Sequence, residues 1–327
     1  MNPFLCYEHV PGIIGIKTNI KNFRWGFGKC SKPVDESVFE NCQYKIVVER
    51  KMDSHVFDSV NLDSFDLYFR YFKGAKDNRC LIFDRTVGKI IHLRYYINMY
   101  EKQIHIIVGK SYLRFVRIKL MNLHPISSVL FDAISAVLLQ NHMTSLYCSS
   151  IKLSDGKSAV FMAPPNTGKS LTVLRLKRDF GANILSEDMA ITNGREIWGA
   201  PYTNLFRNYH DKSLCAEGNY APITCPQKID YVFFLQKGEK IQSIQTFDYS
   251  ERLESINRYS LGYYYSPCLR AMNYFNDDFF VPKCMADETR IFKEMENSTK
   301  GFVLENPNPV MFAEQMIDIL KKSEGEV

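Results

Sequence analysis

The sequence predicts an α/β protein in which a β-rich N-terminal domain precedes a second domain that alternates strands with helices. The first part of the chain holds short apolar runs separated by turn residues. The second part holds an apolar strand, a loop and an amphipathic helix in direct succession. The apolar period changes from two residues to three or four near residue 125, so we expect domains at 1–124 and 125–327.

Composition and charge limit the class of protein. The chain has 327 residues, 46% of them hydrophobic, which is enough for one large core or two modest ones. Its 41 Lys and Arg against 36 Asp and Glu give a net charge of +5 without a basic run, so we expect no nucleic-acid partner. Nine scattered cysteines and the lack of an apolar export or spanning segment predict a soluble, cytoplasmic protein that binds no membrane.

The N-terminal domain has the pattern of a β-meander. Six segments carry strand signals, at 45–50, 66–72, 80–84, 89–97, 103–109 and 112–120. The last of these has the clearest alternation, because Val116, Ile118 and Leu120 are separated by charged residues. A strand with one buried face requires such a pattern.

The second domain should begin with an amphipathic helix that ends near Asn141. Its apolar residues recur at three- and four-residue steps from Ile126 to Leu138. A strand, a helix closed by a glycine and a second strand then imply a crossover connection, at 158–162, 169–180 and 183–186.

The remainder of the second domain continues the alternation. Strands are expected at 231–235 and 241–247, and a helix is expected from Ser250. A final helix should start at Pro309, with Asn308 as its N-terminal cap.

The loop between the strand at 158–162 and the following helix reads Ala-Pro-Pro-Asn-Thr-Gly-Lys-Ser. The strict phosphate-binding pattern is Gly, any four residues, then Gly-Lys-Ser or Gly-Lys-Thr. Such a loop needs inward N–H groups, the positive end of a helix, a lysine for the β- and γ-phosphates, and a hydroxyl for Mg²⁺. Gly168, Lys169 and Ser170 meet these needs, and Ala163 can replace the first glycine where φ is negative.

We therefore expect ATP to bind along this loop, and the alternative is a turn that contains Gly-Lys-Ser by chance. The prolines can occupy positions whose N–H groups do not face phosphate. The predicted nucleotide-binding residues are Ala163, Pro164, Pro165, Asn166, Thr167, Gly168, Lys169, Ser170 and Leu171.

Two acids, Glu187 and Asp188, follow the strand at 183–186. In an open parallel sheet the C-terminal strand ends share one edge, so both carboxylates should lie beside the phosphate loop. One can hold Mg²⁺ while the other takes the proton of an attacking hydroxyl. We predict Asp188 and Lys169 as catalytic residues and Ser170, Glu187 and Asp188 as Mg²⁺ ligands, and the alternative is a solvated turn.

Four cations after the acid pair are further candidates for stabilising a transferred phosphoryl group, although each is more simply explained as a surface residue. They are Arg195, Arg207, His210 and Lys212.

Residues of about 126–205 resemble HPr kinase/phosphorylase and the wider set of HPr-kinase-like proteins, whose P-loop fold is shared with phosphoenolpyruvate carboxykinase. The matching segments are "LFDAISAVLLQNHMTSLYCSSIKLSDGKSAVFMAPPNTGKS" and "GANILSEDMAI". The resemblance implies that Lys169 binds phosphate, that Ser170 binds Mg²⁺ and that Asp188 deprotonates a substrate serine. Glu187 stands in place of the family's first aspartate.

The chain departs from the family pattern in three places. Cys148 occupies the position of a family histidine, with His142 or Ser145 as the only nearby substitutes. The loop lacks the family's Ser-Gly, and no Glu-Ile-Arg-Gly-Leu-Gly segment follows the acid pair. The stretch 198–218 instead resembles HPr-kinase-like proteins that phosphorylate serine on a biosynthetic precursor peptide.

These features predict an ATP- and Mg²⁺-dependent kinase that transfers the γ-phosphoryl group to a hydroxyl, foremost a serine of a peptide or protein. A small-molecule hydroxyl is the alternative acceptor, and the N-terminal domain would recognise or position the partner. A non-catalytic nucleotide-binding regulator and a carboxykinase-like enzyme are the rival functions. The sequence leaves open the choice between ATP and GTP and whether the chain forms homo-oligomers.

Overall fold

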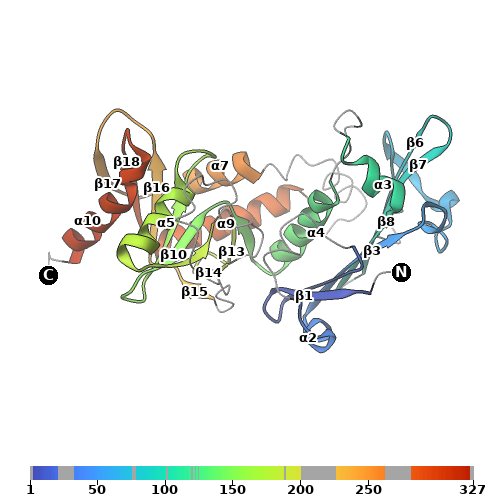
Figure 1. The fold of residues 1–327 in the computed structure, drawn as a ribbon, viewed down its shortest axis with the longest axis horizontal. Coiled ribbons are helices and arrows are strands. Elements are labelled where there is room, and N and C mark those ends of the chain that lie inside the picture. The colour runs from blue at the N-terminus through green and yellow to red at the C-terminus, as the bar shows by residue number, and fades with distance from the viewer. Residues whose placement is uncertain are drawn as a thin grey trace. The chain divides into compact units, whose positions relative to one another are not determined.

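The computed structural model describes residues 3–20, 33–75, 79–100, 102–118, 121, 123, 125–187, 189–199, 226–261 and 281–324. These residues divide into two compact units (Figure 1). The first contains 3–140 and 281–285, and the second contains 141–261 and 286–324. Both combine helices with sheets, so the α/β class is confirmed. The division follows Gln140, whereas the apolar period predicts a boundary after residue 124.

The first unit is built on an eight-stranded sheet. In sheet order the strands are β1 (Leu5–Val10), β2 (Ile14–Thr18), β3 (Tyr44–Lys51), β8 (Gln103–Gly109), β7 (Ile91–Tyr100), β6 (Cys80–Val87), β5 (Phe72–Ala75) and β4 (Asp66–Phe69). Strands β4 to β8 pair antiparallel in chain order, which confirms the meander. Strand β3 lies parallel to both β2 and β8. The single strand predicted at 66–72 is wrong, because the chain turns at Arg70 with a φ of 46°.

Residues 110–115 form a helix, α3 (Lys110–Phe115), so the strand predicted at 112–120 is wrong. The carboxylate of Asp53 accepts a hydrogen bond from the N–H of Ser111 at 3.0 Å, at the start of the helix. Tyr112 is fully buried, with its ring 5.5 Å from that of Phe83 and 5.1 Å from that of Tyr95. This aromatic packing outweighs the local two-residue pattern.

Four further helices belong to the described part of the first unit: α2 (Glu36–Asn41), η1 (Asp53–His55), η2 (Leu62–Ser64) and α4 (Ile126–Gln140). The predicted helix at 126–141 is thus confirmed as α4. Twelve of its residues are buried, including the polar Asp132 and Ser135. Burial on all sides distinguishes α4 from the amphipathic surface helix that the pattern predicts.

The second unit contains a six-stranded mixed sheet. In sheet order its strands are β12 (Asn183–Ser186), β10 (Ser149–Lys152), β11 (Ser158–Met162), β16 (Tyr231–Gln236), β18 (Lys300–Glu305) and β17 (Gln242–Thr246). Strands β11, β16 and β18 run parallel, and β10 and β17 run antiparallel to their neighbours, so the sheet is mixed, whereas the argument for the acid pair used a parallel sheet. Because β10 is antiparallel to both β11 and β12, the last two point the same way and end at one edge.

A four-stranded sheet accompanies the six-stranded one. Its order is β15 (Gln227–Lys228), β14 (Glu196–Gly199), β13 (Ala190–Thr192) and β9 (Thr144–Leu146). The chain passes between the two sheets from β9 to β10, from β12 to β13 and from β15 to β16. Leu146 pairs with Ala190, and Ser150 pairs with Ser186, so the first two crossings lie side by side.

Helices cover both faces of the six-stranded sheet. On one face α5 (Lys169–Phe180) and α10 (Phe312–Glu324) share a core with Phe161 and Phe233. On the other, α7 (Ser250–Leu261), α9 (Val281–Ser298) and the four-stranded sheet share a core with Val160 and Phe234. The short helix η6 (Pro309–Met311) precedes α10, and the predicted strands and helices of this region are confirmed. None of the helices in the described ranges is long and apolar enough to cross a bilayer.

A buried histidine in β1 makes the stability of the first unit depend on pH. Burial lowers the pKa of His9 to about 3, from an ordinary value of 6.5. Between these values the unfolded chain binds a proton that the folded unit does not, so stability is full above pH 6.5 and falls as the pH drops toward 3. We expect a loss of about 1.4 kcal/mol per pH unit, measured by hydrogen exchange of the β1 amides.

Two variants test this pH dependence. His9→Leu should flatten the slope, whereas His55→Leu should leave it unchanged, because the His55 side chain is 61% exposed. An equal slope in the wild type and in His9→Leu would assign the acid sensitivity to other groups.

Candidate functional site

The loop 163–168 leaves β11 and enters α5, as the sequence predicts. Two of its residues have positive φ, Gly168 at 117° and Asn166 at 65°. Asparagine is one of the few side chains that tolerate this region, so Asn166 can take a conformation for which glycine is the usual choice. Ala163 has no positive φ and is fully buried in the core, which confirms the expected tolerance for alanine there. Pro164 and Pro165 are exposed.

The ammonium of Lys169 lies beside the carbonyl oxygens of Ala163 and Pro164, at a position that we call the mouth of the loop. Its Nζ donates hydrogen bonds to the carbonyl oxygens of Ala163 at 2.9 Å and of Pro164 at 3.3 Å. The side chain is only 4% exposed. The ammonium is therefore held beside the turn that would surround a phosphate, rather than extended into solvent.

Tyr147 lies against the same ammonium, with Lys169 Nζ 4.1 Å from the centroid of its ring. Tyr147 belongs to the crossing between β9 and β10, and its N–H donates to Asn257 Oδ1 at 2.7 Å. Asn257, on α7, is fully buried and also donates to Glu288 Oε1 at 3.1 Å. A buried polar network thus holds the backbone of the residue whose ring faces the loop lysine.

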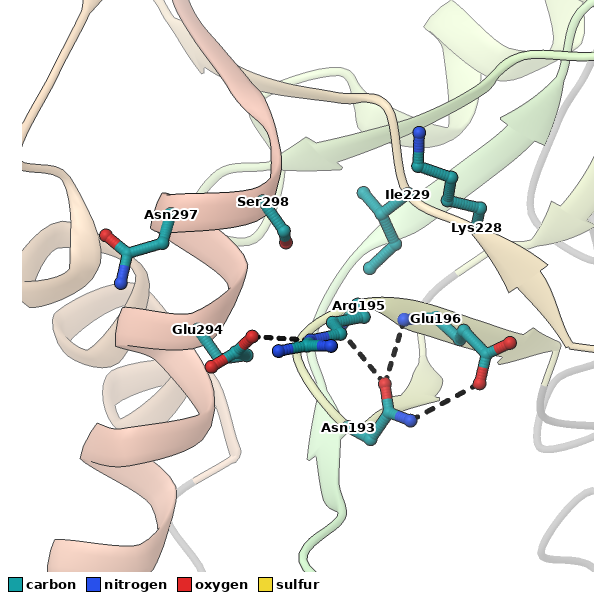
Figure 2. Close-up of a pocket in the computed structure, with 8 residues that line it drawn as sticks. All are labelled: Asn193, Arg195, Glu196, Lys228, Ile229, Glu294, Asn297 and Ser298. Atoms are coloured by element: carbon teal, nitrogen blue, oxygen red, sulfur yellow. Dashed lines mark hydrogen bonds and ion pairs between the residues drawn. The ribbon is translucent and has the colours of Figure 1, made fainter.

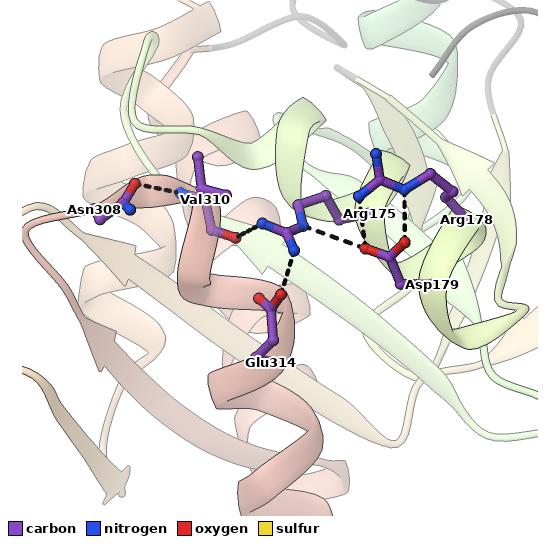
Figure 3. Close-up of polar contacts among 6 residues, drawn as sticks. All are labelled: Arg175, Arg178, Asp179, Asn308, Val310 and Glu314. Atoms are coloured by element: carbon purple, nitrogen blue, oxygen red, sulfur yellow. Dashed lines mark hydrogen bonds and ion pairs between the residues drawn. The ribbon is translucent and has the colours of Figure 1, made fainter. Parts of the chain in front are cut away.

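The segment that precedes α10 lies beside the last residue of the loop. A Cβ added to Gly168 would lie 2.8 Å from the Cβ of Pro309. Arg175 of α5 donates to the carbonyl of Val310 at 3.0 Å and pairs with Glu314 of α10 (Figure 3). Asn308 accepts from the N–H of Val310 at 3.1 Å, which confirms its predicted capping role. The middle of α5 is therefore tied to the start of α10.

The strand ends bring Glu187 to the same sheet edge as the loop. Ser150 pairs with Val160 on one side and with Ser186 on the other, so two strand spacings, about 10 Å, separate β12 from β11 there. The Ser149 hydroxyl donates to the carbonyl of Glu187. Glu187 is 7% exposed.

Groups of the kinds that bind phosphate and divalent cations lie at this edge. The first N–H groups of a helix lack intrahelical partners and favour anions, and α5 begins at Lys169 beside the loop. The Ser170 hydroxyl is half-buried in the first turn, and with the Glu187 carboxylate it offers the hard oxygen ligands that Mg²⁺ prefers. In the described ranges, no group of three or more His, Cys, Asp or Glu gathers as a metal site.

Four of the predicted candidate residues lie outside the described residues, and they are Asp188, Arg207, His210 and Lys212. Cys148 is fully buried in the core, and its thiol lies 3.9 Å from the Ser186 hydroxyl.

The two residues considered as substitutes for the family histidine have other surroundings. His142 is exposed and contacts Arg290 of α9 at 2.7 Å. Ser145 is buried, and its carbonyl accepts from Asn257 at 3.0 Å.

Arg195 lies at a different site, on the hairpin between β13 and β14. It pairs with Glu294 and its side chain is 71% exposed, as expected of a surface residue. Together with Lys228 and Ser298 it lines a pocket of about 560 Å³ (Figure 2). The hairpin is at the end of β13 opposite to the crossing from β12, so this pocket is separate from the phosphate loop.

The residues around Lys169 that the sequence did not identify come from distant parts of the chain. Tyr147, Asn257 and Glu288 carry no motif, and Pro309 was recognised only as a helix start. The contact between the Tyr147 ring and the Lys169 ammonium depends on how the two sheets pack, and no local sequence pattern predicts that packing. Neither a scan against models of known protein families nor a search of curated proteins returned a match to this chain.

Proposed function

We propose that this chain is an ATP- and Mg²⁺-dependent kinase that transfers the γ-phosphoryl group to a serine hydroxyl of a peptide or protein. The observation that supports this most is the position of the Lys169 ammonium, bonded to the carbonyls of Ala163 and Pro164 between β11 and α5. Glu187 at the same sheet edge supports it further. The proposed fold is an HPr-kinase-like P-loop core preceded by a β-rich domain.

The proposed reaction uses groups on three segments. The loop amides and Lys169 would hold the β- and γ-phosphates, and Ser170 and Glu187 would hold Mg²⁺, with Asp188 as a further ligand. Mg²⁺ would neutralise phosphate charge. Asp188 would accept the proton of the acceptor hydroxyl, whose oxygen forms a bond to the γ-phosphorus. The bond from that phosphorus to the bridging oxygen breaks, and ADP leaves.

The left-handed Asn166 supports the resemblance to HPr-kinase-like proteins despite the altered loop. The family pattern has glycine at this position, and here asparagine adopts a φ of 65°. The loss of the glycine therefore does not require a different backbone course. On the same resemblance we assign the first unit to recognition or positioning of the peptide or protein partner. The nine scattered cysteines favour the cytoplasm as the location of the protein.

A non-catalytic nucleotide-binding regulator is the second candidate, because of Cys148. The residue that replaces the family histidine is buried in the core, where it is in no position to act as an acid or base toward a bound nucleotide. In this candidate function the loop binds the nucleotide, but no phosphoryl group is transferred.

Asp188→Asn separates the two candidates. We expect the variant to keep ATP affinity within about 2-fold and to lose phosphoryl transfer by about 100-fold or more, because general base catalysis is worth about that much. The measurement is incorporation of label from γ-labelled ATP into serine-containing peptides, with nucleotide binding measured in parallel. Binding without transfer or hydrolysis by the wild type would favour the regulator.

A further inference from the structure

We propose that Tyr147 is a positioning residue for Lys169, and that its ring holds the ammonium in the mouth of the loop in readiness for phosphate. The inference rests on the proposed nucleotide binding, and it deepens it by adding a residue outside the loop motif. Tyr147 comes from the crossing between two sheets, far from the loop in sequence.

The contact has the geometry of a cation–π interaction. Lys169 Nζ lies 4.1 Å from the ring centroid, well inside the range of about 6 Å within which such contacts attract. An ammonium has three N–H donors, and the carbonyls of Ala163 and Pro164 accept from it on the loop side. The negative face of the Tyr147 ring adds attraction from a second direction.

Burial explains why this support matters. Lys169 is 4% exposed, and a buried ammonium needs partners that replace its lost hydration. The two carbonyls and the aromatic face supply part of this replacement. An ammonium held in this way has already lost rotational freedom that phosphate binding would otherwise remove.

The backbone that carries the ring is held by buried hydrogen bonds. The N–H of Tyr147 donates to Asn257 Oδ1 at 2.7 Å, and Asn257 is fully buried. The amide of Asn257 donates to the carbonyl of Ser145 at 3.0 Å and to Glu288 Oε1 at 3.1 Å. These bonds connect the backbone of Tyr147 to α7 and α9, so the point from which the ring projects does not depend on the loop.

The first test compares Tyr147→Leu with Tyr147→Phe by calorimetry of MgATP and of inorganic tripolyphosphate. Leu removes the aromatic face, and we expect affinity for both ligands to fall about 3- to 20-fold. Phe keeps the face and should stay within about 2-fold of the wild type. Tyr259→Leu, on the exposed surface of α7, is the matched control and should bind normally. Unchanged or tighter binding by Tyr147→Leu would overturn the proposal.

A second test keeps the shape of the side chain and changes only the charge of its face. Phenylalanine, 4-fluorophenylalanine and 3,4,5-trifluorophenylalanine are placed at position 147, and tripolyphosphate affinity should fall with each step of fluorination. A packing role would give equal affinities across the series, which would contradict the proposal even if Tyr147→Leu did not fold.

Lys169→Met distinguishes failure of this inference from failure of the proposed function. If the wild type binds both ligands, Lys169→Met loses them and the Tyr147 variants are unaffected, only the role of Tyr147 is wrong. If the wild type binds neither ligand, the proposed nucleotide site and the role of Tyr147 are both wrong.

Discussion

Lys169→Met is expected to lower kcat/KM for phosphoryl transfer about 10²- to 10³-fold and to weaken MgATP binding. The reason is that Lys169 supplies the positive charge buried in the loop mouth, where a fixed cation stabilises phosphate charge far more than in water. Methionine keeps the length and apolar stem but removes the ammonium. The measurement is the initial rate of transfer from γ-labelled ATP, with binding by calorimetry.

The folded state should largely survive this change. The carbonyls of Ala163 and Pro164 lose a donor, which costs about 1 kcal/mol each in the free energy of unfolding. Lys177→Met, in the last turn of the same helix, is the matched control and should retain transfer and binding. A Lys169→Met variant that bound and transferred normally would remove the basis of the proposed function.

Gly168→Ala is expected to lower the free energy of unfolding by about 2–4 kcal/mol and to abolish nucleotide binding. Two effects add. The φ of Gly168 is 117°, a region that costs an L-residue about 1–2 kcal/mol, and the added Cβ would lie 2.8 Å from the Cβ of Pro309. Because η6 is tied to α5 through Arg175, the loop is poorly able to relax by moving Pro309 away. Urea unfolding and MgATP titration measure the two outcomes.

Gly181→Ala is the control for this prediction. Gly181 also has a positive φ, 68°, but nothing lies within 4 Å of the added Cβ. Its cost should be about 1 kcal/mol, from backbone strain alone, and nucleotide binding should persist. If the two variants were equally stable and bound MgATP equally well, the contact between the loop and η6 would contribute nothing to stability or to binding.

The elements that the sequence predicts correctly are those whose signals are local. The strand at 158–162, the loop and the helix from Lys169 to Phe180 each carry their own pattern, and Gly181 ends the helix with a φ of 68°. The final helix was likewise recognisable, because Asn308 and Pro309 are strong start signals. In these segments, propensity and tertiary packing favour the same structure.

Prediction failed where a distant contact decides the local structure. The alternation of residues 112–120 resembles a strand, but Tyr112 packs edge-on against the stacked rings of Phe83 and Tyr95, and the helix after β8 brings it there. The antiparallel strand β10 between β11 and β12 was missed for a similar reason. One of the two strands that β10 pairs with is distant along the chain. Ser150 of β10 pairs with Ser186 of β12, more than thirty residues later.

Prediction of the candidate site was divided in the same way. The loop residues and Glu187 follow from strand ends, which a sequence can identify, and the structure brings both to one edge. Tyr147 and its support from Asn257 follow from packing between sheets and helices, for which a single sequence offers no signal. The role of Asp188 stays a prediction.

The paired crossings between the two sheets of the second unit limit how this unit can deform. Two peptide segments, one after β9 and one after β12, connect the same two layers at neighbouring points. Shear between the layers at this edge would have to stretch both covalent links at once. At the opposite edge of the four-stranded sheet the chain crosses once more, from β15 to β16, so the two sheets are linked at both of its edges. We therefore expect any movement relative to Tyr147 and Glu187 to come from the loop or from the helices.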